Sequence, residues 1–439
     1  MISLPNISEL SIGEKIKHMR QAQGISQENI AHALKYSQTT ISRIESGLAD
    51  YDKEMITALK KYMEIETAPL LDYEVAAYRN RLLAWGELVA DNRIVEAQAI
   101  KDELAVILHV PYEADMILFY TMVETRMLFI EGEYKLAHEK LLKYPTLPGD
   151  AGTETQYLYH YNYGFLYINV TREFKKALHH LRKAFDMRSG DIQRDLSLYT
   201  HLSSAYVNLC KPVRAIVHLE QAIREFGVQR TNPALIAMTL QLAYCYSLTG
   251  ELKLAKKLAT PIIEQLRGLD SPLYIHAASV LAKICILTGD LDESYEYSTR
   301  AYALLQAHSA PKKEYIQAYI TVLATMALCL LELKRNAEFE TVIETGKSIV
   351  EGNTTFTMLF DSIGHLATLR DPVSTDYLEN VGIPLLTSAS MVTRDFALWM
   401  CGKLEQHYNN RGLSKKTMAI AALSRDIYRD ILWGGADID

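Results

Sequence analysis

The chain has 439 residues, 49% of them hydrophobic and 23% charged, and its 46 Lys and Arg against 53 Asp and Glu give a formal net charge of −7. This length predicts two or three domains, and this composition excludes a largely disordered chain. The negative charge excludes a general basic attraction to nucleic acid. Residues 1–66 alone hold eight Lys and Arg against nine Asp and Glu, so any affinity for DNA depends on where the charges lie.

Targeting patterns are weak in this sequence. The first ten residues, MISLPNISEL, lack the basic stretch and continuous apolar core of a signal peptide. The longest apolar run, VLATMALCLL, is too short to cross a bilayer. We therefore expect a cytoplasmic protein with no membrane partner. The absence of a CxxC pair favours reduced core thiols over disulfides or a metal site. The cysteines are Cys210, Cys245, Cys285, Cys329 and Cys401.

Residues 11–66 predict four short helices. Apolar residues recur at helical spacing in the first three, at Ile12, Ile16 and Met19, then Ile30, Ala31 and Leu34, then Ile41 and Ile44. Gly24 and Gly47 mark helix ends, and Ser26 and Ser37 are candidate N-caps of the second and third helices. The fourth helix lies in KEMITALKKYMEI. Four short helices with a tight connection between the second and third indicate a helix-turn-helix module.

The stretch SQENIAHALKYSQTTISRIESG resembles the DNA-binding segment of the XRE class of helix-turn-helix domains. The Ser-Gln start, Ala31, Ile41 and the Ile-Glu-Ser-Gly ending all fall in the register of that class. The resemblance implies that the third helix enters the major groove with its first residues facing the bases. The implied DNA-binding residues are Gln27, Ser37, Gln38, Thr39, Thr40 and Arg43.

The chemistry of these side chains suits base recognition. Gln bonds adenine, Arg bonds guanine and the Thr methyl group contacts the thymine methyl group. The resemblance also implies that Gln27 touches a phosphate and braces Gln38, and that Arg20 and Glu45 pair inside the module. The alternative is an ordinary solvated surface, but such a surface is usually rich in Lys and Glu rather than in Gln and Thr.

From about residue 73 the chain repeats itself with a period near 39 residues. Small or tolerant residues recur at Gly86, Thr125, Gly164, Ser203, Ala243 and Ala282. A second position, mostly small, follows at Gln98, Ala137, Ala177, Ala215, Ala255 and Ser294. Gly132, Gly250 and Gly289 lie between the two, each followed by an acid, as expected where one helix ends and another begins. Each unit is thus predicted to be a helical hairpin.

Two of these units, YNYGFLYINVTREFKKALHHLRKAF and HLSSAYVNLCKPVRAIVHLEQAI, resemble tetratricopeptide repeats, although their period exceeds the usual 34 residues. The resemblance implies a right-handed superhelix with an extended concave surface. The fold prediction is therefore all-α. It places a four-helix helix-turn-helix domain at 1–66, a short linker at 67–72 containing Pro69, and a repeat domain for peptide binding and dimerisation at 73–439.

In tetratricopeptide repeats the first helix of each pair lines the groove. The groove positions predicted to bind a peptide are Arg126, Tyr161, Asn169, Thr200, Ser204, Asn208, Tyr244 and Lys283. Asn169 and Asn208 occupy equivalent positions, and an Asn amide can bond both the N–H and the C=O of an extended peptide. Helix capping is an equal alternative for both, because both lie near helix ends. Arg126 and Lys283 either hold a ligand carboxylate or are solvated charges.

A single XRE-type module followed by such an array resembles the RRNPP family of peptide-pheromone receptors. The resemblance implies a cytoplasmic, homodimeric transcription regulator for quorum sensing or mobile-element control. It would bind double-stranded DNA at an inverted-repeat operator and a short oligopeptide signal in its groove. The alternative is an adaptor whose repeats mainly bind a protein partner, with DNA binding secondary or independent of peptide.

Enzymatic functions find little support in the sequence. It contains no GxxxxGK[ST] phosphate loop and no HExxH, GxSxG or EF-hand motif. The adjacent His179 and His180 follow the core position Ala177, which favours a packing or surface role over metal binding. We therefore predict no catalytic site, no cofactor and no metal.

Overall fold

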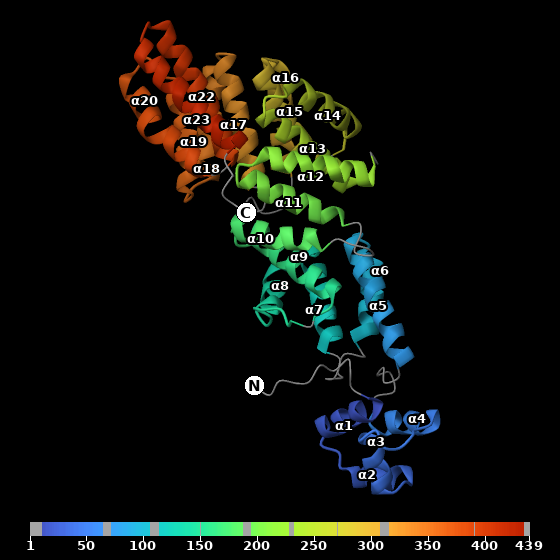
Figure 1. Cartoon of the computed structure of the whole chain (residues 1–439). Coiled ribbons are helices and arrows are strands. Elements are labelled where there is room, and N and C mark those ends of the chain that lie inside the picture. Colours follow the sequence, from blue (N-terminus) through green and yellow to red (C-terminus); the bar gives the residue numbers. More distant parts are fainter. Residues whose placement is uncertain are drawn as a thin grey trace. The chain divides into compact units, whose positions relative to one another are not determined.

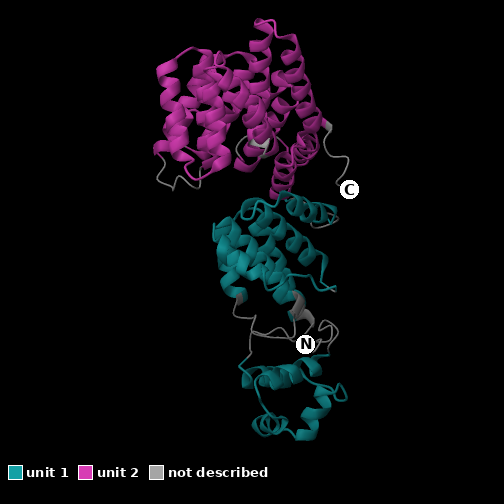
Figure 2. Cartoon of the chain, turned by 90° about the vertical axis from the view of Figure 1, so that its left-hand side faces the viewer, with its two compact units in different colours: residues 1–195 teal, residues 196–439 magenta. Residues whose placement is uncertain are grey.

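A computed structural model describes residues 11–64, 72–105, 114–149, 151–187, 195–227, 232–269, 271–307, 316–389 and 391–433. Every regular element in these ranges is helical (Figure 1). The chain divides into two compact units, residues 1–195 and 196–439 (Figure 2). The all-α prediction is confirmed, with helix-turn-helix elements first and paired helices after them.

The first four helices begin and end close to the expected positions. They are α1 (Ile12–Ala22), α2 (Gln27–Leu34), α3 (Gln38–Glu45) and α4 (Lys53–Tyr62). The hydroxyls of Ser26 and Ser37 accept backbone N–H bonds from Asn29 and Thr40, which confirms both as N-caps. The apolar stripes meet in one buried core that includes Ile16, Ile30, Ile41, Ile44, Met55 and Leu59.

Paired helices fill the rest of unit 1. They are α5 (Asp72–Ala90), α6 (Ile94–Ala105), α7 (Ala114–Ile130), α8 (Tyr134–Leu141), α9 (Thr153–Asn169) and α10 (Phe174–Asp186). The predicted linker at 67–72 lies almost wholly outside the described residues, since only Asp72 falls within them. The first helices of successive pairs contact one another, α5 against α7 and α7 against α9. They therefore form the inner layer of this unit.

Unit 2 continues the pairs. Its helices are α11 (Leu196–Asn208), α12 (Pro212–Phe226), α13 (Pro233–Leu248), α14 (Leu252–Gln265), α15 (Pro272–Thr288), α16 (Leu291–Ala307), α17 (Ile316–Glu332), α18 (Asn336–Ile349), α19 (Thr354–Leu366), α20 (Pro372–Tyr377), α21 (Ile383–Ala389), α22 (Met391–Asn410) and α23 (Ser414–Trp433), with a π-helical turn η2 (Leu378–Gly382) before α21. The odd-numbered helices α11 to α19 again contact one another in succession. In addition, α22 contacts α11 and α23 contacts α12, so the last helices of unit 2 pack against its first pair.

The small residues of the repeat lie where helices approach closely. Thr125, Ser203, Ala243 and Ala282 are buried, and a Cβ added to Gly164 would lie 2.5 Å from the Leu181 side chain. At the second small position, Ala137, Ala177, Ala215, Ala255 and Ser294 are fully buried. In the first pair this buried position is Ala97, not Gln98, whose amide bonds Asp102 at an exposed site.

The turns inside the pairs share one backbone conformation. Gly132, Gly250 and Gly289 have φ values of 83°, 88° and 85°, as their proposed role at helix ends requires. The equivalent turns of other pairs place residues with side chains in the same left-handed region. These are Asn92, Arg172, Cys210 and Lys334, with φ between 56° and 59°. The turn is therefore common to the repeats even where the sequence shows no glycine.

No helix among the described residues is both long enough and apolar enough to span a membrane.

Candidate DNA-recognition helix and repeat groove

Helix α3 presents its N-terminal side chains to solvent. Gln38, Thr39 and Arg43 are exposed, whereas Ile41 and Ile44 on the opposite face are buried. The Ser37 hydroxyl lies 2.8 Å from that of Thr40, so these two candidates bond each other at the helix start. An Arg43 N–H donates to the Leu48 carbonyl at 3.3 Å. Exposed amide and hydroxyl groups at the start of α3 and the Arg43 guanidinium in its last turn thus lie on one helix, the type of side chains that base recognition in the major groove uses.

Glu45 fixes the position of α3 from the buried side. Arg20 of α1 donates two hydrogen bonds to its carboxylate, at 2.6 and 2.9 Å, and a third to the Ile25 carbonyl. The hydrogen bond to Glu45 raises the pKa of Arg20. Arg20 therefore lies inside the domain as a structural residue, as the family resemblance implied.

Gln27 makes a contact that the sequence did not predict. Its side-chain N–H donates to Glu45 at 2.8 Å, which ties the Gln27 amide to the far end of α3. Phosphate contact by Gln27 and its bracing of Gln38 stay predictions. Gln27 is the first residue of α2. Close packing completes this framework, because a Cβ on Gly13 would lie 1.9 Å from the Ile44 carbonyl oxygen.

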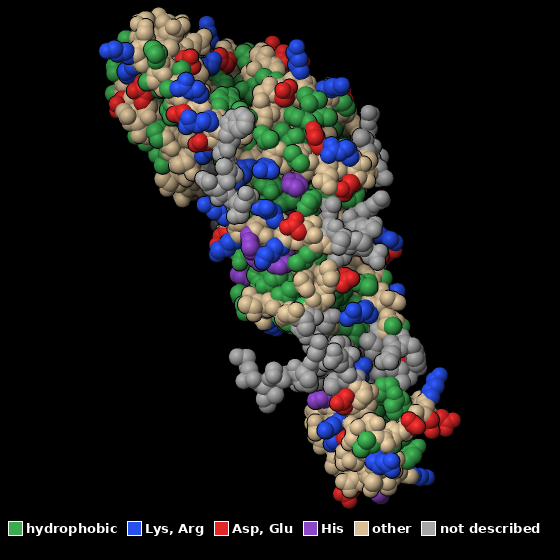
Figure 3. Space-filling model, viewed as in Figure 1, with side chains coloured by type: hydrophobic (Ala, Val, Ile, Leu, Met, Phe, Trp, Pro, Cys, Tyr) green, Lys and Arg blue, Asp and Glu red, His purple; other side chains and the backbone are tan. Residues whose placement is uncertain are grey.

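Charge is evenly distributed over this domain. On the face seen in Figure 3, the Lys and Arg side chains of the first four helices are interspersed with Asp and Glu. This agrees with the near-neutral count for residues 1–66. Electrostatic attraction of a single copy of this domain to a phosphate backbone would consequently be modest.

In unit 1 the predicted groove residue Arg126 lies in a buried ion pair. Its guanidinium lies 2.5 Å from Asp195 and stacks over the Tyr161 ring, 4.1 Å from the centroid. Tyr157 donates a hydrogen bond to the same carboxylate oxygen at 2.7 Å. Burial lowers the pKa of Arg126, but the charge of Asp195, the neighbouring Tyr161 and Tyr157 and the hydrogen bond to Asp195 together raise it above its usual value. Arg126 and Tyr161 therefore meet each other, and the arginine already has a carboxylate partner.

Asn169 and Asn208 occupy matching places at the last residues of α9 and α11. Each donates its amide N–H to a carbonyl one turn back in its own helix, Asn169 to Phe165 at 3.2 Å and Asn208 to Ser204 at 2.9 Å. This is local bonding at a helix end, which supports the structural role that the sequence left as an equal alternative. Peptide contact by Asn169 or Asn208 stays a prediction.

The remaining groove candidates of unit 2 lie on α11, α13 and α15. Thr200 bonds the Leu196 carbonyl at 3.3 Å, and Ser204 accepts a hydrogen bond from Gln241 at 3.0 Å. Tyr244 and Lys283 meet at one carboxylate, that of Asp395 on α22. The Lys283 ammonium lies 2.6 Å from it and the Tyr244 hydroxyl 3.2 Å. Burial raises the pKa of Asp395 despite the neighbouring cation.

A cavity of about 330 Å³ lies beside Tyr244 and Lys283. Its walls come from α13, α15 and α17. They are largely apolar, with a few polar side chains, and comprise Tyr244, Pro272, Ile275, His276, Ser279, Val280, Lys283, Gln317, Ala318 and Thr321. The volume is at the lower end of the range for small-molecule pockets. The cavity therefore suits part of a ligand, such as one side chain of a peptide.

The histidine pair packs between two helices. His180 of α10 lies with its Nδ1 3.0 Å from that of His160 on α9, and its ring stacks on Tyr163. Burial lowers the pKa of His160 to about 4 and that of His180 to about 3. Neutral rings sharing one hydrogen bond account for this arrangement, in keeping with the packing role expected for His180.

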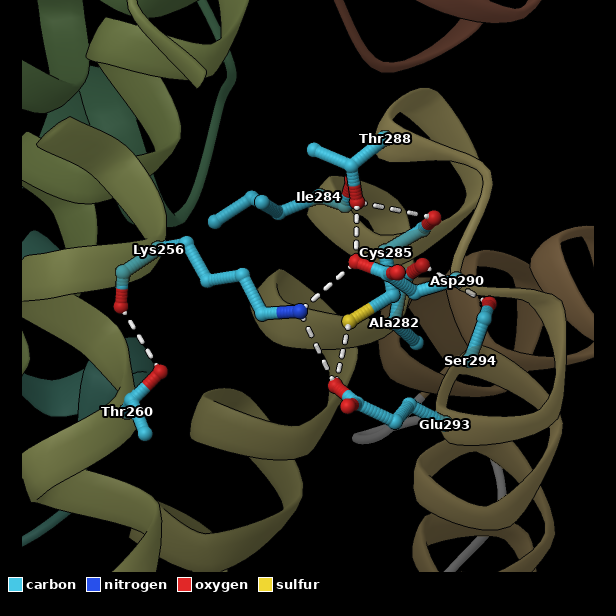
Figure 4. A network of polar contacts seen from close by, with 9 residues as sticks. All are labelled: Lys256, Thr260, Ala282, Ile284, Cys285, Thr288, Asp290, Glu293 and Ser294. Atoms are coloured by element: carbon cyan, nitrogen blue, oxygen red, sulfur yellow. Dashed lines mark hydrogen bonds and ion pairs between the residues drawn. The ribbon is translucent and has the colours of Figure 1, made fainter. Parts of the chain in front are cut away.

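Metal-type donors gather at one place in unit 2. The candidate ligand atoms of Cys285, Asp290 and Glu293 all lie within 4.8 Å of one another. Figure 4 shows Lys256 reaching into this group, with its ammonium 2.7 Å from Asp290 and 3.0 Å from Glu293. Burial raises the pKa of Cys285 to about 12, so its thiol stays protonated and donates to Glu293. The lysine neutralises the carboxylates, and the group joins α14 to the turn between α15 and α16.

Comparison with known proteins finds matches for the helix-turn-helix domain and for the repeat fold. Residues 16–70 match a family model described as helix-turn-helix. No curated protein sequence matches the chain. Among solved structures, the apo form of the quorum sensor NprR from B. thuringiensis is 20% identical with a TM-score of 0.62, covering 81% of this chain and 99% of that one. NprR in complex with its cognate peptide NprX is 19% identical with a TM-score of 0.61, covering 80% and 99%.

A second group of structures shares the same fold. A Rap protein complexed with Competence and Sporulation Factor is 14% identical with a TM-score of 0.63, covering 81% of this chain and 98% of that one. Aspartyl phosphate phosphatase F from Bacillus subtilis is 14% identical with a TM-score of 0.51, covering 82% and 96%. At such identities the likeness is one of fold. The RRNPP resemblance is thus confirmed in its architecture, a helix-turn-helix domain followed by the repeat fold of these proteins.

Two residues at the candidate groove were missed by sequence analysis. Asp195 and Asp395 each hold a predicted basic groove residue, yet they lie 69 and 112 residues away from it in sequence. Asp395 belongs to the less regular C-terminal region, where no repeat pattern marks which face of α22 is inward. The only signal in the sequence was that each of these two buried basic residues needs an acidic partner.

Proposed function

We propose that this protein is a DNA-binding transcription regulator controlled by a short oligopeptide bound in the groove of its repeats. The observation that carries the proposal is the combination of a helix α3 that exposes Gln38, Thr39 and Arg43 with a repeat fold like that of NprR bound to its cognate peptide. Because its target would be operator DNA, the protein would act in the bacterial cytoplasm. We infer a homodimer, since one helix-turn-helix domain reads only one half of an inverted repeat.

The proposed control follows from differential affinity. A peptide changes DNA binding only if it binds one arrangement of the protein more tightly than another. We favour Tyr244 and Lys283 over Arg126 because they line the cavity, even though Asp395 pairs with Lys283 as Asp195 pairs with Arg126. The proposal assigns no catalytic role, cofactor or metal to the chain.

The DNA-binding part of the proposal is tested by replacing two residues that are expected to contact the bases. Gln38→Ala and Arg43→Ala should each reduce binding to the protein's own upstream region by about 1–3 kcal/mol and relax the preference for that sequence. Glu28→Ala, an exposed change on α2, is the matched control. Binding would be measured by fluorescence anisotropy at fixed salt. Unchanged specificity in both variants would exclude α3 as the recognition helix.

The peptide half is tested on the same DNA. Synthetic peptides taken from the C-terminal ends of small open reading frames beside the gene would be added to the protein–DNA mixture. A peptide that shifts DNA affinity or footprint supports the proposal. If DNA binds but none of the peptides alters it, peptide control is rejected.

The second candidate is an adaptor that mainly binds a protein partner. It is favoured by the fold shared with the Rap protein and with aspartyl phosphate phosphatase F, and by the internal bonding of Asn169 and Asn208. An adaptor predicts that a folded partner, rather than a peptide, alters DNA binding. The peptide experiment separates the two.

A further inference from the structure

We propose that the cavity beside Lys283 holds the C-terminal residue of an oligopeptide, with an aliphatic side chain in the cavity and the terminal carboxylate on the Lys283 ammonium in exchange for Asp395. This inference deepens the proposed function and rests on it. It names one end of the ligand and the residue that the ligand displaces.

The shape and lining of the cavity define the side chain. Pro272, Ile275, Val280 and Ala318 supply apolar walls from α15 and α17. A volume of about 330 Å³ is too small for a folded segment and suits one aliphatic side chain with its backbone. The hydrophobic effect rewards such a side chain in proportion to the apolar area that it buries.

Lys283 supplies the charge at one wall. Its side chain is 10% exposed, and its ammonium lies between the rings of Phe396 and Tyr244, 4.7 and 5.2 Å from their centroids. An ammonium has three N–H donors. The hydrogen bond identified for this one among the described residues goes to Asp395. A poorly hydrated cation with donors to spare, at the edge of an apolar cavity, is complementary to a carboxylate attached to an aliphatic residue.

Asp395 competes for the same cation. Its carboxylate also accepts the Tyr244 hydroxyl, so α13 and α15 both hold α22 through this one group. Two carboxylates on one buried ammonium leave an uncompensated negative charge, which is costly away from water. The peptide carboxylate therefore exchanges with Asp395 rather than adding to it, and the displaced Asp395 carboxyl, whose pKa burial already raises, takes up a proton from solvent in place of its lost cation. Occupying the cavity in this way releases a hold on α22.

The test uses the full-length protein and two small probes, N-acetyl-leucine and N-acetyl-leucinamide, which differ only in the terminal charge. Both are expected to bind in the millimolar range, as ligands of this size do. Isothermal titration and saturation-transfer NMR would give the affinities. The acid should bind about tenfold more tightly than the amide, because only the acid forms a charge-assisted hydrogen bond with Lys283.

Three variants locate the effect. Lys283→Met should abolish the preference for the acid, and Asp395→Asn should strengthen acid binding several-fold by removing the competing charge. Ala318→Phe, which fills the cavity, should abolish binding of both probes. Asp290→Asn is the matched control, because it removes an aspartate charge from the ion pair with Lys256 in the same unit (Figure 4) and should leave the preference unchanged.

Several results would overturn the inference. These are equal affinity for acid and amide in the wild-type protein, no saturable binding of either probe, a preference that persists in Lys283→Met, or saturable binding in Ala318→Phe. Circular dichroism verifies that each variant is folded. If a longer peptide controls DNA binding while these probes fail, the proposed function stands and this site falls. If the probes behave as expected while no peptide affects DNA, the site stands and the regulatory function falls.

Discussion

Glu45 shows how a single buried residue positions the recognition helix. Its side chain is 1% exposed and accepts hydrogen bonds from Arg20 of α1 and Gln27 of α2, so it connects three helices. Neither Arg20 nor Glu45 can be replaced by a neutral residue without leaving the charge of the other buried and uncompensated.

Replacing Glu45 with Gln should therefore destabilise the helix-turn-helix domain by about 3–5 kcal/mol. Hydrogen exchange of the amides in residues 11–64 of the full-length protein would report the opening free energy. The exposed Glu28→Gln, on α2, is the control and should change it by less than about 0.5 kcal/mol. A similar small change in both variants would show that the ion pair contributes little beyond its cost of burial.

Two helical glycines provide a matched test of close packing. A Cβ at position 164 would lie 2.5 Å from both Cγ and Cδ2 of the buried Leu181, whereas at position 86 the nearest atoms of Phe119 and Val123 are 3.6 Å away. Gly164→Ala should destabilise unit 1 by about 1–3 kcal/mol through overpacking. Gly86→Ala should be neutral or stabilise it by up to about 1 kcal/mol through helix propensity. Urea denaturation of both variants measures the two changes in the free energy of unfolding. Equal changes would contradict the packing argument.

At this scale the sequence predicted what depends on local chemistry. The capping roles of Ser26 and Ser37 follow from neighbours within a few residues, and the small residue at Gly164 follows from the repeat period. The partners of Arg126 and Lys283 did not, because ion pairs across 69 and 112 residues depend on how helices stack rather than on local pattern. The burial of Ala97 in place of Gln98 is an error of one residue on a helix, where adjacent positions face different directions.

The left-handed turn is a property of the helical pair as an element. Arg172 adopts φ of 56° in the turn between α9 and α10, at the place that Gly250 occupies between α13 and α14. A side chain in this region carries a steric cost that glycine avoids. The sequence predicted this turn only where a glycine stands. Elsewhere tertiary packing overrides the residue preference.

Arg172→Gly should accordingly stabilise unit 1, by about 0.5–1 kcal/mol, because the relief of strain exceeds the added flexibility of the unfolded chain. The reverse change, Gly250→Ala, should destabilise unit 2 by about 1 kcal/mol. No atom lies within 4 Å of the added Cβ, so backbone conformation alone is tested. Thermal unfolding of both variants shows whether each change raises or lowers stability. A loss of stability in Arg172→Gly would refute the argument.

The α9–α10 pair should also respond to pH. Burial lowers the pKa of His160 from 6.5 to about 4, with smaller contributions from Lys183 and His179. Between these two pH values the unfolded chain binds a proton at His160 and the folded protein does not. The stability linked to this group is complete above about pH 6.5 and is lost as the pH falls toward 4. The expected loss is on the order of 2 kcal/mol.

This pH dependence can be measured as the urea midpoint of unit 1 at several pH values. His180→Phe keeps an aromatic ring against Tyr163 and removes the titration of His180, whose pKa burial lowers to about 3, so it should flatten the curve. His138→Phe, a change on the neighbouring helix α8, serves as the control. A curve of unchanged shape in His180→Phe would show that other groups cause the pH dependence.

For the whole molecule, the proposed function requires two copies for tight DNA binding, because one helix-turn-helix domain is nearly neutral. We therefore expect affinity for an operator whose half-sites are one helical turn apart to fall at least tenfold when about half a turn of DNA is inserted between them. Sedimentation of the protein should reveal a dimer under the same conditions. Equal affinity for both spacings would indicate that each domain binds DNA independently.

The sequence predicted that the chain forms helical pairs, but it did not predict how the last helices pack. Periodicity near 39 residues gave the helical pairs because each pair repeats the same small positions. Beyond Ala282 the repeat weakens, and the packing of α22 and α23 against α11 and α12 was not foreseen. Contacts between the two ends of an array leave no periodic signal, since they occur once. The right-handed superhelix and the domain boundaries remain predictions.

That return of the last helices to the first pair has a consequence for how unit 2 folds. In an open array each repeat touches only its neighbours, so stability grows by increments and repeats can be lost from an end one at a time. Contacts of α22 with α11 and of α23 with α12 join elements about 200 residues apart. Unit 2 should then behave as a closed ring: removing the last hairpin uncovers the first, folding waits for the chain to be complete, and unfolding proceeds as a single cooperative event.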